Sequence, residues 1–128
     1  MIITDTVGFI KNLPKNLLEA FKATLEELAE ADLLIHVVDL SNPRFVEQMA
    51  VVADILASLN LQEKPLLTVF NKADLADRNL AALQCRIHGG VAISAIDPGS
   101  LPPLSARLER QVDELAARTD WGRLQREL

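Results

Sequence analysis

The residues best suited to chemistry are four consecutive side chains, Asn71-Lys72-Ala73-Asp74. A carboxylate such as Asp74 can accept two hydrogen bonds at once, and charge-assisted bidentate bonds are the strong ones. The N1–H and exocyclic amine of guanine form such a donor pair, and adenine lacks it, so the wrong base would leave the carboxylate unpaired. Lys72 can lay its methylene stem over a purine ring, and Asn71 can hold the loop. The tetrapeptide favours a guanine-reading loop, with a simple polar turn as the alternative.

Two weaker patterns stand on either side of this tetrapeptide. In Asp5-Thr6-Val7-Gly8, Asp5 could hold Mg²⁺ through a water, and the Gly8 amide could meet a terminal phosphate because glycine has no Cβ. In Ser94-Ala95, the Ala95 amide could donate to the guanine oxygen O6. Each pattern alone is also compatible with an ordinary strand end. Their order along the chain gives them weight.

The hydrophobic pattern supplies alternating elements to position these residues. Continuous apolar runs, typical of strands buried on both faces, occur at Ile2–Asp5, Leu33–Asp39, Leu66–Phe70 and Val91–Ile93. Apolar residues at helical spacing follow them at about 17–28, 45–59, 78–84 and 101–115, and a short final turn is expected over 121–128. Strands alternating with helices predict an α/β fold: a parallel sheet with right-handed crossovers between helical layers, a three-layer sandwich.

Polar residues mark where two of the helices should begin. Asn42 is expected to cap the helix whose first residue is Pro43. Ser100 is the candidate cap of the last helix, with Pro102 in its first turn.

The ligand edge of the sheet follows from the strand ends. Ligands of open α/β sheets bind at the carboxyl ends of the strands, and each of the three patterns above directly follows an expected strand. Asp39 and Ser41 also end a strand on this side. Asp39 could touch the site, but a cap or turn role is favoured for both. His36, inside the same apolar run, is expected to be a core or near-core histidine.

Size and composition narrow the class of protein. The 128 residues suit one domain, and 49% apolar residues with a mean hydropathy of +0.16 indicate a globular chain. A net charge of −5 means that the chain lacks the excess of positive charge on which non-specific nucleic-acid binding depends. The single cysteine, Cys85, cannot form an internal disulfide and fits a reducing compartment, so a cytoplasmic location is expected. The longest apolar run is far too short to span a membrane.

The stretch Asp5–Pro14 (DTVGFIKNLP) closely resembles the HflX family of translation-factor-related GTPases. The following Leu18, Phe21 and Thr24-Leu25-Glu26-Glu27, and the segment Ala31–Ser41, are also similar to that family. The resemblance covers roughly Ile2–Ala95. It implies a Ras-like G domain that binds GTP or GDP with Mg²⁺, hydrolyses GTP and associates with the large ribosomal subunit. The implied nucleotide contacts are Asn71, Lys72, Asp74, Ser94, Ala95 and Gly8, and the implied metal contact is Asp5.

One residue departs from the usual catalytic pattern of G proteins. Many of them place a glutamine after the Asp-x-x-Gly glycine to orient the attacking water. Phe9 stands there in this chain and cannot do so. No catalytic residue is therefore assigned.

The phosphate-binding loop Gly-x-x-x-x-Gly-Lys-Ser/Thr is absent from these residues. The five glycines are Gly8, Gly89, Gly90, Gly99 and Gly122, and none precedes a lysine. In the resembled family this loop and switch I precede the Asp-x-x-Gly strand. We therefore interpret residues 1–128 as a single partial, truncated G domain of about four strands and four to five helices. A degenerate natural paralogue is the rival explanation.

Activity and association follow from this interpretation. We expect the isolated chain to bind GTP weakly or not at all and to lack hydrolysis. An exposed, apolar sheet edge invites self-association. The alternative function is a non-catalytic α/β interaction module that binds protein or ribosome and no nucleotide.

Overall fold

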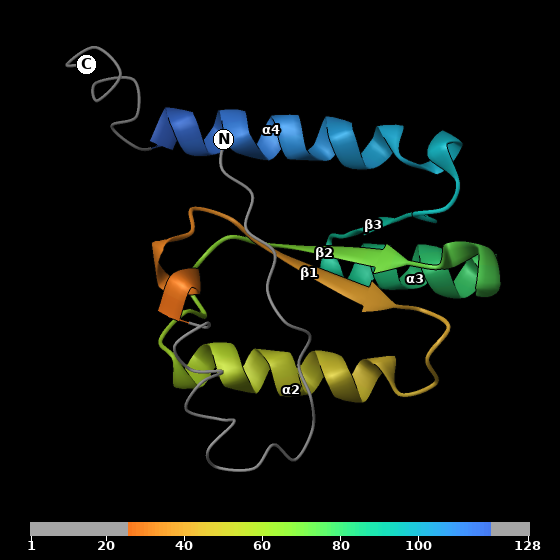
Figure 1. Cartoon of the computed structure of the whole chain (residues 1–128), viewed down its shortest axis with the longest axis horizontal. Helices are drawn as coiled ribbons and strands as arrows, with labels where there is room; N and C mark the ends of the chain where they lie inside the picture. The colour runs from red at the N-terminus through yellow and green to blue at the C-terminus, as the bar shows by residue number, and fades with distance from the viewer. Residues whose placement is uncertain (1–25, 119–128) are drawn as a thin grey trace.

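The computed structural model describes residues 26–118. The elements in chain order are η1 (Glu27–Glu30), β1 (Leu34–Asp39), α2 (Phe45–Ser58), β2 (Leu66–Asn71), η2 (Ala73–Leu75), α3 (Arg78–His88), β3 (Val91–Ala92), η3 (Pro98–Ser100) and α4 (Pro102–Arg118), where η marks a short 3₁₀ turn. Figure 1 shows the sheet as a middle layer, with α2 on one side and α4 on the other. The expected α/β sandwich is confirmed for this part of the chain.

The sheet is parallel throughout the described residues, in the order β1-β2-β3. The β1–β2 register runs from Leu34 opposite Leu66 to Asp39 opposite Asn71. Both strands therefore end at the same edge. The expected strand Ile2–Asp5, nearly all of the expected helix at 17–28 and the final turn at 121–128 lie outside the described residues.

The core is centred on β2, whose middle residues are buried on both faces as expected. Phe70, fully buried, packs with Val38, Phe45 and Ala81 on the side of α2 and α3. On the opposite side β2 packs against α4 through a cluster of aliphatic side chains: Leu67, Val69, Ile93, Leu101, Leu104 and Leu108. The central position of β2 fixes the loop that follows it.

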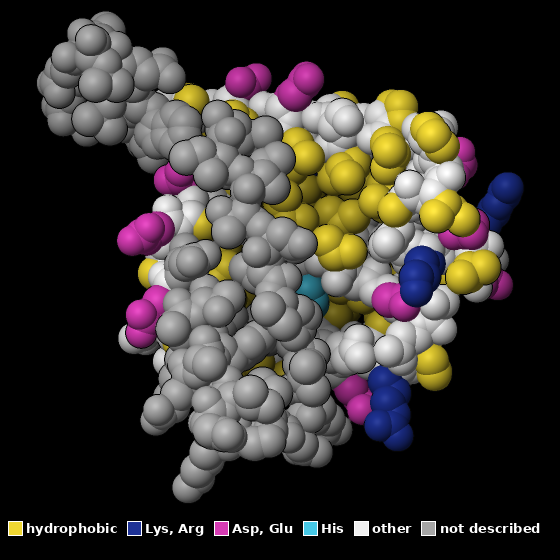
Figure 2. Space-filling model, in the orientation of Figure 1, with side chains coloured by type: hydrophobic (Ala, Val, Ile, Leu, Met, Phe, Trp, Pro, Cys, Tyr) yellow, Lys and Arg dark blue, Asp and Glu magenta, His cyan; other side chains and the backbone are white. Residues whose placement is uncertain are grey.

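The expectation that every strand is buried on both faces is wrong for β1. Leu34 and Val38 are buried, but Ile35 is 45% and Val37 60% exposed. These two are the register partners of Leu67 and Val69, so they face the side of α4. The leucines of α4 pack over β2 and β3, one strand away. In the space-filling view, hydrophobic side chains are gathered between α4 and the strands (Figure 2).

α2 begins two residues later than its sequence signal indicates. Arg44 is the N-cap residue and Phe45 the first helical residue. Asn42 closes a turn instead: its Oδ1 accepts from the Arg44 amide at 2.9 Å, and its carbonyl accepts from the Phe45 amide at 3.1 Å. The expected Asn42 cap and Pro43 start are therefore wrong, because the side chain satisfies the turn before the helix.

α3 extends four residues beyond its expected end at Gln84. Asp77 caps its start, where one carboxylate oxygen accepts from the amides of Asn79 and Leu80. Gly89, with φ of 64°, ends it by donating its amide to the Cys85 carbonyl. Only a left-handed residue closes a helix in this way, and glycine adopts that conformation freely.

α4 begins at Pro102, one residue after its expected start at Leu101, and Ser100 does not cap it. The Leu101 carbonyl accepts from the amides of Leu104 and Ser105 and so opens the helix. The Ser100 hydroxyl is engaged elsewhere, at the end of β3. Within residues 26–118, no helix combines the length and the apolar character needed to cross a membrane.

Candidate guanine-reading site

The loop Asn71–Asp74 makes a sharp turn at the carboxyl end of β2. Lys72 adopts a left-handed conformation, with φ of 59° and ψ of 35°, which is uncommon for a residue with a Cβ. The amide of Ala73 then donates to the Ile93 carbonyl at 3.0 Å. This bond ties the loop to the end of β3. Lys72 and Asp74 are both exposed to solvent on this turn.

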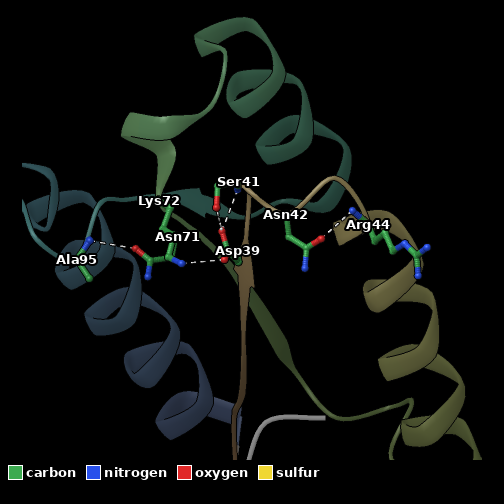
Figure 3. A network of polar contacts seen from close by, with 7 residues as sticks. All are labelled: Asp39, Ser41, Asn42, Arg44, Asn71, Lys72 and Ala95. Carbon is green, nitrogen blue, oxygen red and sulfur yellow. Dashed lines mark hydrogen bonds and ion pairs between the residues drawn. The ribbon is translucent and has the colours of Figure 1, made fainter. Parts of the chain in front are cut away.

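Asn71 joins the ends of all three described strands. Its Oδ1 accepts from the Ala95 amide at 3.0 Å, and its backbone carbonyl accepts from the Leu40 amide at 3.1 Å. Figure 3 shows the Asn71 side chain directed towards Ala95. Two of the sequence-predicted patterns, Asn71–Asp74 and Ser94-Ala95, are therefore side by side.

Ser94 and Ala95 are held in place by Ser100, which the sequence pattern predicts as a helix cap. The Ser94 amide donates to the Ser100 hydroxyl oxygen at 2.9 Å, and that oxygen lies 2.8 Å from the carbonyl oxygens of both Ser94 and Asp97. One hydroxyl proton serves one carbonyl at a time. Ser100 thus fixes the loop that carries Ala95. No sequence signal distinguishes this role from a helix cap.

Asp39 contacts the site through Lys72. The Lys72 Nζ donates to Asp39 Oδ2 at 2.9 Å, and Asp39 Oδ1 accepts from both the amide (2.9 Å) and the hydroxyl (2.6 Å) of Ser41 (Figure 3). The Ser41 hydrogen bonds, together with Lys72, lower the pKa of Asp39. The favoured turn role is present, and the contact to Lys72 comes in addition to it.

Asp74 lies in η2 and its side chain is exposed. Among the described residues, none forms a hydrogen bond or ion pair with its carboxylate. Both oxygens are free to accept from a ligand there. The two carboxylate oxygens of Asp74 therefore fit, as acceptors, the N1–H and amine edge of guanine. At Ala95 the fit is conditional, because a base oxygen must share the Ala95 amide with Asn71 Oδ1 or displace that oxygen.

The metal and phosphate contacts cannot be assembled from this part of the chain. Asp5 and Gly8 lie outside the described residues. Within those residues, no group of three or more His, Cys, Asp and Glu side chains could hold a metal ion. The role of Asp5 at Mg²⁺ stays a prediction.

Lys72, Asp74 and Ala95 are exposed at the strand ends. A hollow of about 490 Å³ lies instead along α4, beside Leu108 and Val112, and a smaller one of about 250 Å³ lies beside Val91 and Arg107. Neither is lined by Asn71, Lys72 or Asp74. A base bound at the strand ends would be held by its edge and one face.

Comparison with known proteins shows the family to which the chain is similar. Residues 1–72 match a protein family described as 50S ribosome-binding GTPase. The GTPase HflX of Lacrimispora saccharolytica is 45% identical over 109 residues, covering 85% of this chain and 26% of that protein. The GTPase HflX of Caldanaerobacter subterraneus is 51% identical over 112 residues, covering 88% and 25%. The putative GTP-binding protein 6 of Xenopus laevis is 46% identical over 80 residues, covering 60% and 15%. The chain spans about a quarter of the length of these bacterial relatives.

Proposed function

The chain belongs to the HflX family of 50S ribosome-binding GTPases, and we propose that residues 26–118 carry the guanine-reading half of a GTP-binding domain. The observation that supports this most is the convergence of Asn71, Lys72 and Ala95 at the strand ends beside an unengaged Asp74. Asp74 accepts from the guanine N1–H and amine. The stem of Lys72 lies against the ring face, and Asn71 keeps Ala95 beside the base.

The phosphate side of the proposal rests on Asp5 and Gly8. Asp5 would hold Mg²⁺ through a water and the Gly8 amide would approach the terminal phosphate. Mg²⁺, when bound, neutralises charge on the phosphates. In the complete protein these contacts support hydrolysis of GTP. The 128 residues contain no phosphate-binding loop and no glutamine beside Gly8.

The affinity of this chain alone follows from the contacts that it offers. Each hydrogen bond to the base contributes about 0.5–3 kcal/mol net, and association costs roughly 4 kcal/mol or more in lost freedom. We therefore expect a dissociation constant for GTP of about 1 mM or weaker, which corresponds to about −4 kcal/mol. We expect no hydrolysis by the isolated chain.

We further propose two associations for the protein. The first is with the large ribosomal subunit, which the description of the matching family supports. The second is self-association through β1. Among the described residues β1 pairs only with β2, and its face carries the exposed Ile35 and Val37. A non-catalytic interaction module is the second candidate function, and the same exposed apolar side chains favour it.

The test of guanine reading is a titration of the chain with GMP and AMP, followed through backbone amide resonances. We expect GMP, but not AMP, to shift the amides of Lys72–Leu75 and Ala95. Asp74→Asn should weaken GMP binding by about 10- to 100-fold, since it removes charge-assisted bonds worth about 1.5–3 kcal/mol.

The matched control is Asp77→Asn, which makes the same change three residues along at the cap of α3. Asparagine caps a helix about as well as aspartate, so GMP binding should be unchanged. Equal responses to GMP and AMP, or an Asp74→Asn chain that binds GMP as the original does, would support the interaction module instead.

A further inference from the structure

The Asp39 carboxylate is oriented by hydrogen bonds that do not involve Lys72. Its Oδ1 accepts two hydrogen bonds from Ser41, at 2.9 Å from the amide and 2.6 Å from the hydroxyl. A carboxylate fixed on one oxygen has a defined direction for the other. That other oxygen, Oδ2, is the one that Lys72 Nζ contacts at 2.9 Å.

The strand register brings the two residues together across 33 positions of sequence. Asp39 and Asn71 are paired at the last step of the β1–β2 ladder, and Lys72 follows directly in a left-handed turn. Figure 3 shows the lysine and the carboxylate at the neighbouring strand ends, joined by the ion pair. The methylene stem of Lys72 therefore connects the loop after β2 to the end of β1.

A lysine whose ammonium is free in water samples many rotamers of its flexible four-carbon stem. A fixed counter-charge restricts that sampling. Because the ion pair is exposed, with the side chains of Lys72 and Asp39 50% and 37% accessible, it adds little to the stability of the fold. The ion pair instead fixes the direction of the Lys72 stem. A stem that is already ordered can pack against a purine ring with a smaller loss of side-chain entropy on binding.

We propose that Asp39 is a positioning residue for guanine-nucleotide binding, acting through Lys72. The proposal rests on the function proposed above and extends it to a residue outside the Asn71–Asp74 motif. Asp39 sets where the purine ring face is supported, while Asp74 selects the base edge. Loss of Asp39 should therefore lower the affinity for a purine nucleotide without changing which base is preferred.

A double-mutant cycle tests the proposal. The variants Asp39→Asn, Lys72→Met and their combination are titrated with GMP by amide resonances, on the complete 128-residue chain. We expect Asp39→Asn to weaken GMP binding about 2- to 5-fold, the range of an exposed ion pair. In the Lys72→Met background the same change should have no further effect, and Asp77→Asn serves as the matched control.

The base preference separates positioning from general damage. In the Asp74→Asn background, Asp39→Asn should weaken binding of XMP by the same 2- to 5-fold factor and leave the ratio of GMP to XMP affinity unaltered. An equal loss of GMP affinity with and without Lys72, or no loss at all, would overturn the proposal.

A second measurement needs no nucleotide. The mobility of the Lys72 Cε, measured by NMR relaxation in the free chain, should increase in Asp39→Asn and stay unchanged in Asp77→Asn. Unchanged mobility in Asp39→Asn would refute the positioning role whatever the nucleotide does. If Lys72 is ordered by Asp39 but the unmodified chain shows no preference for GMP over AMP, the guanine-reading function is the part that fails.

Discussion

At the scale of residues, Asn71 organises the site. It contacts the ends of β1 and β3 while it is itself the last residue of β2. Its side-chain oxygen accepts a hydrogen bond from the Ala95 amide, and the exposed side chains of Lys72 and Asp74 follow on the same turn. One residue thus ties the strand-end loops together, and the side chains of Lys72 and Asp74 beside it stay exposed.

His36 gives a residue-scale prediction about pH. It is half-buried in β1, and burial lowers its pKa below the ordinary value of about 6.5. The unfolded chain therefore binds the proton more readily. The stability that His36 confers is complete above about pH 6.5 and is lost as pH falls through the lowered pKa of the folded state.

The measurement is the urea midpoint of the chain at about pH 7.5 and about pH 5.5, for the original chain and for His36→Gln. We expect the midpoint of the original chain to fall more on acidification than that of the variant. Equal falls in the two proteins would show that His36 does not contribute.

The site residues differ in how far sequence could predict them. Asn71, Lys72 and Asp74 are near neighbours in the sequence, so their grouping on one loop was predictable. The contact of Lys72 with Asp39 was not, because it joins residues 33 positions apart through the strand register. The role of Ser100 was missed because serine before a helix looks the same whether it caps the helix or holds a loop.

At the scale of elements, the junction of α3 and β3 leaves no room for a side chain at Gly90. A Cβ on Gly90 would lie 2.4 Å from the Thr68 carbonyl oxygen of β2 and 3.1 Å from the Phe70 ring. Gly89, one residue earlier, has open space around it and a positive φ. Adjacent glycines are thus needed for different reasons.

Gly90→Ala should destabilise the chain by about 1–3 kcal/mol or more, because the backbone of β2 cannot move aside easily. Gly89→Asn should be tolerated within a few tenths of a kcal/mol, since asparagine also accepts the left-handed cap. Urea unfolding of both variants checks this. Similar losses of stability in the two would contradict the steric argument.

The strands followed the apolar runs closely, and the ends of the helices agreed less well with their sequence signals. β1 and β2 agree with their runs within one residue at each end, because a buried strand is defined by its apolar side chains. The Asn42 side chain bonds within the turn before α2 instead of capping the helix, and the Gly89 amide bond ends α3 four residues later than expected. Such bonds depend on three-dimensional turns that the hydrophobic pattern does not encode.

At the scale of the whole molecule, α4 covers only part of one face of the sheet. α4 packs on β2 and β3, and the exposed Ile35 and Val37 extend that face onto β1. Within residues 26–118 the outer edge of β1 has no partner strand, and an apolar face at such an edge favours pairing with another chain. We therefore expect the chain to self-associate as its concentration rises.

Val37→Lys should abolish this association, because a charge placed on the face would have to be buried between chains. The control is Val46→Lys on α2, since Val46 is 59% and Val37 60% exposed. Sedimentation velocity over a concentration series is the measurement. A chain that stays monomeric throughout, or two lysine variants that behave alike, would rule out β1 as the interface.

The central claim is that Asp74 reads the guanine edge, and base preference tests it most directly. Xanthine carries a carbonyl where guanine carries its amine, so an amide at position 74 can donate where the carboxylate only accepts. We predict that the original chain prefers GMP to XMP and that Asp74→Asn reverses this order, with Asp77→Asn keeping the original preference. An Asp74→Asn chain with the original ratio of GMP to XMP dissociation constants would contradict the account.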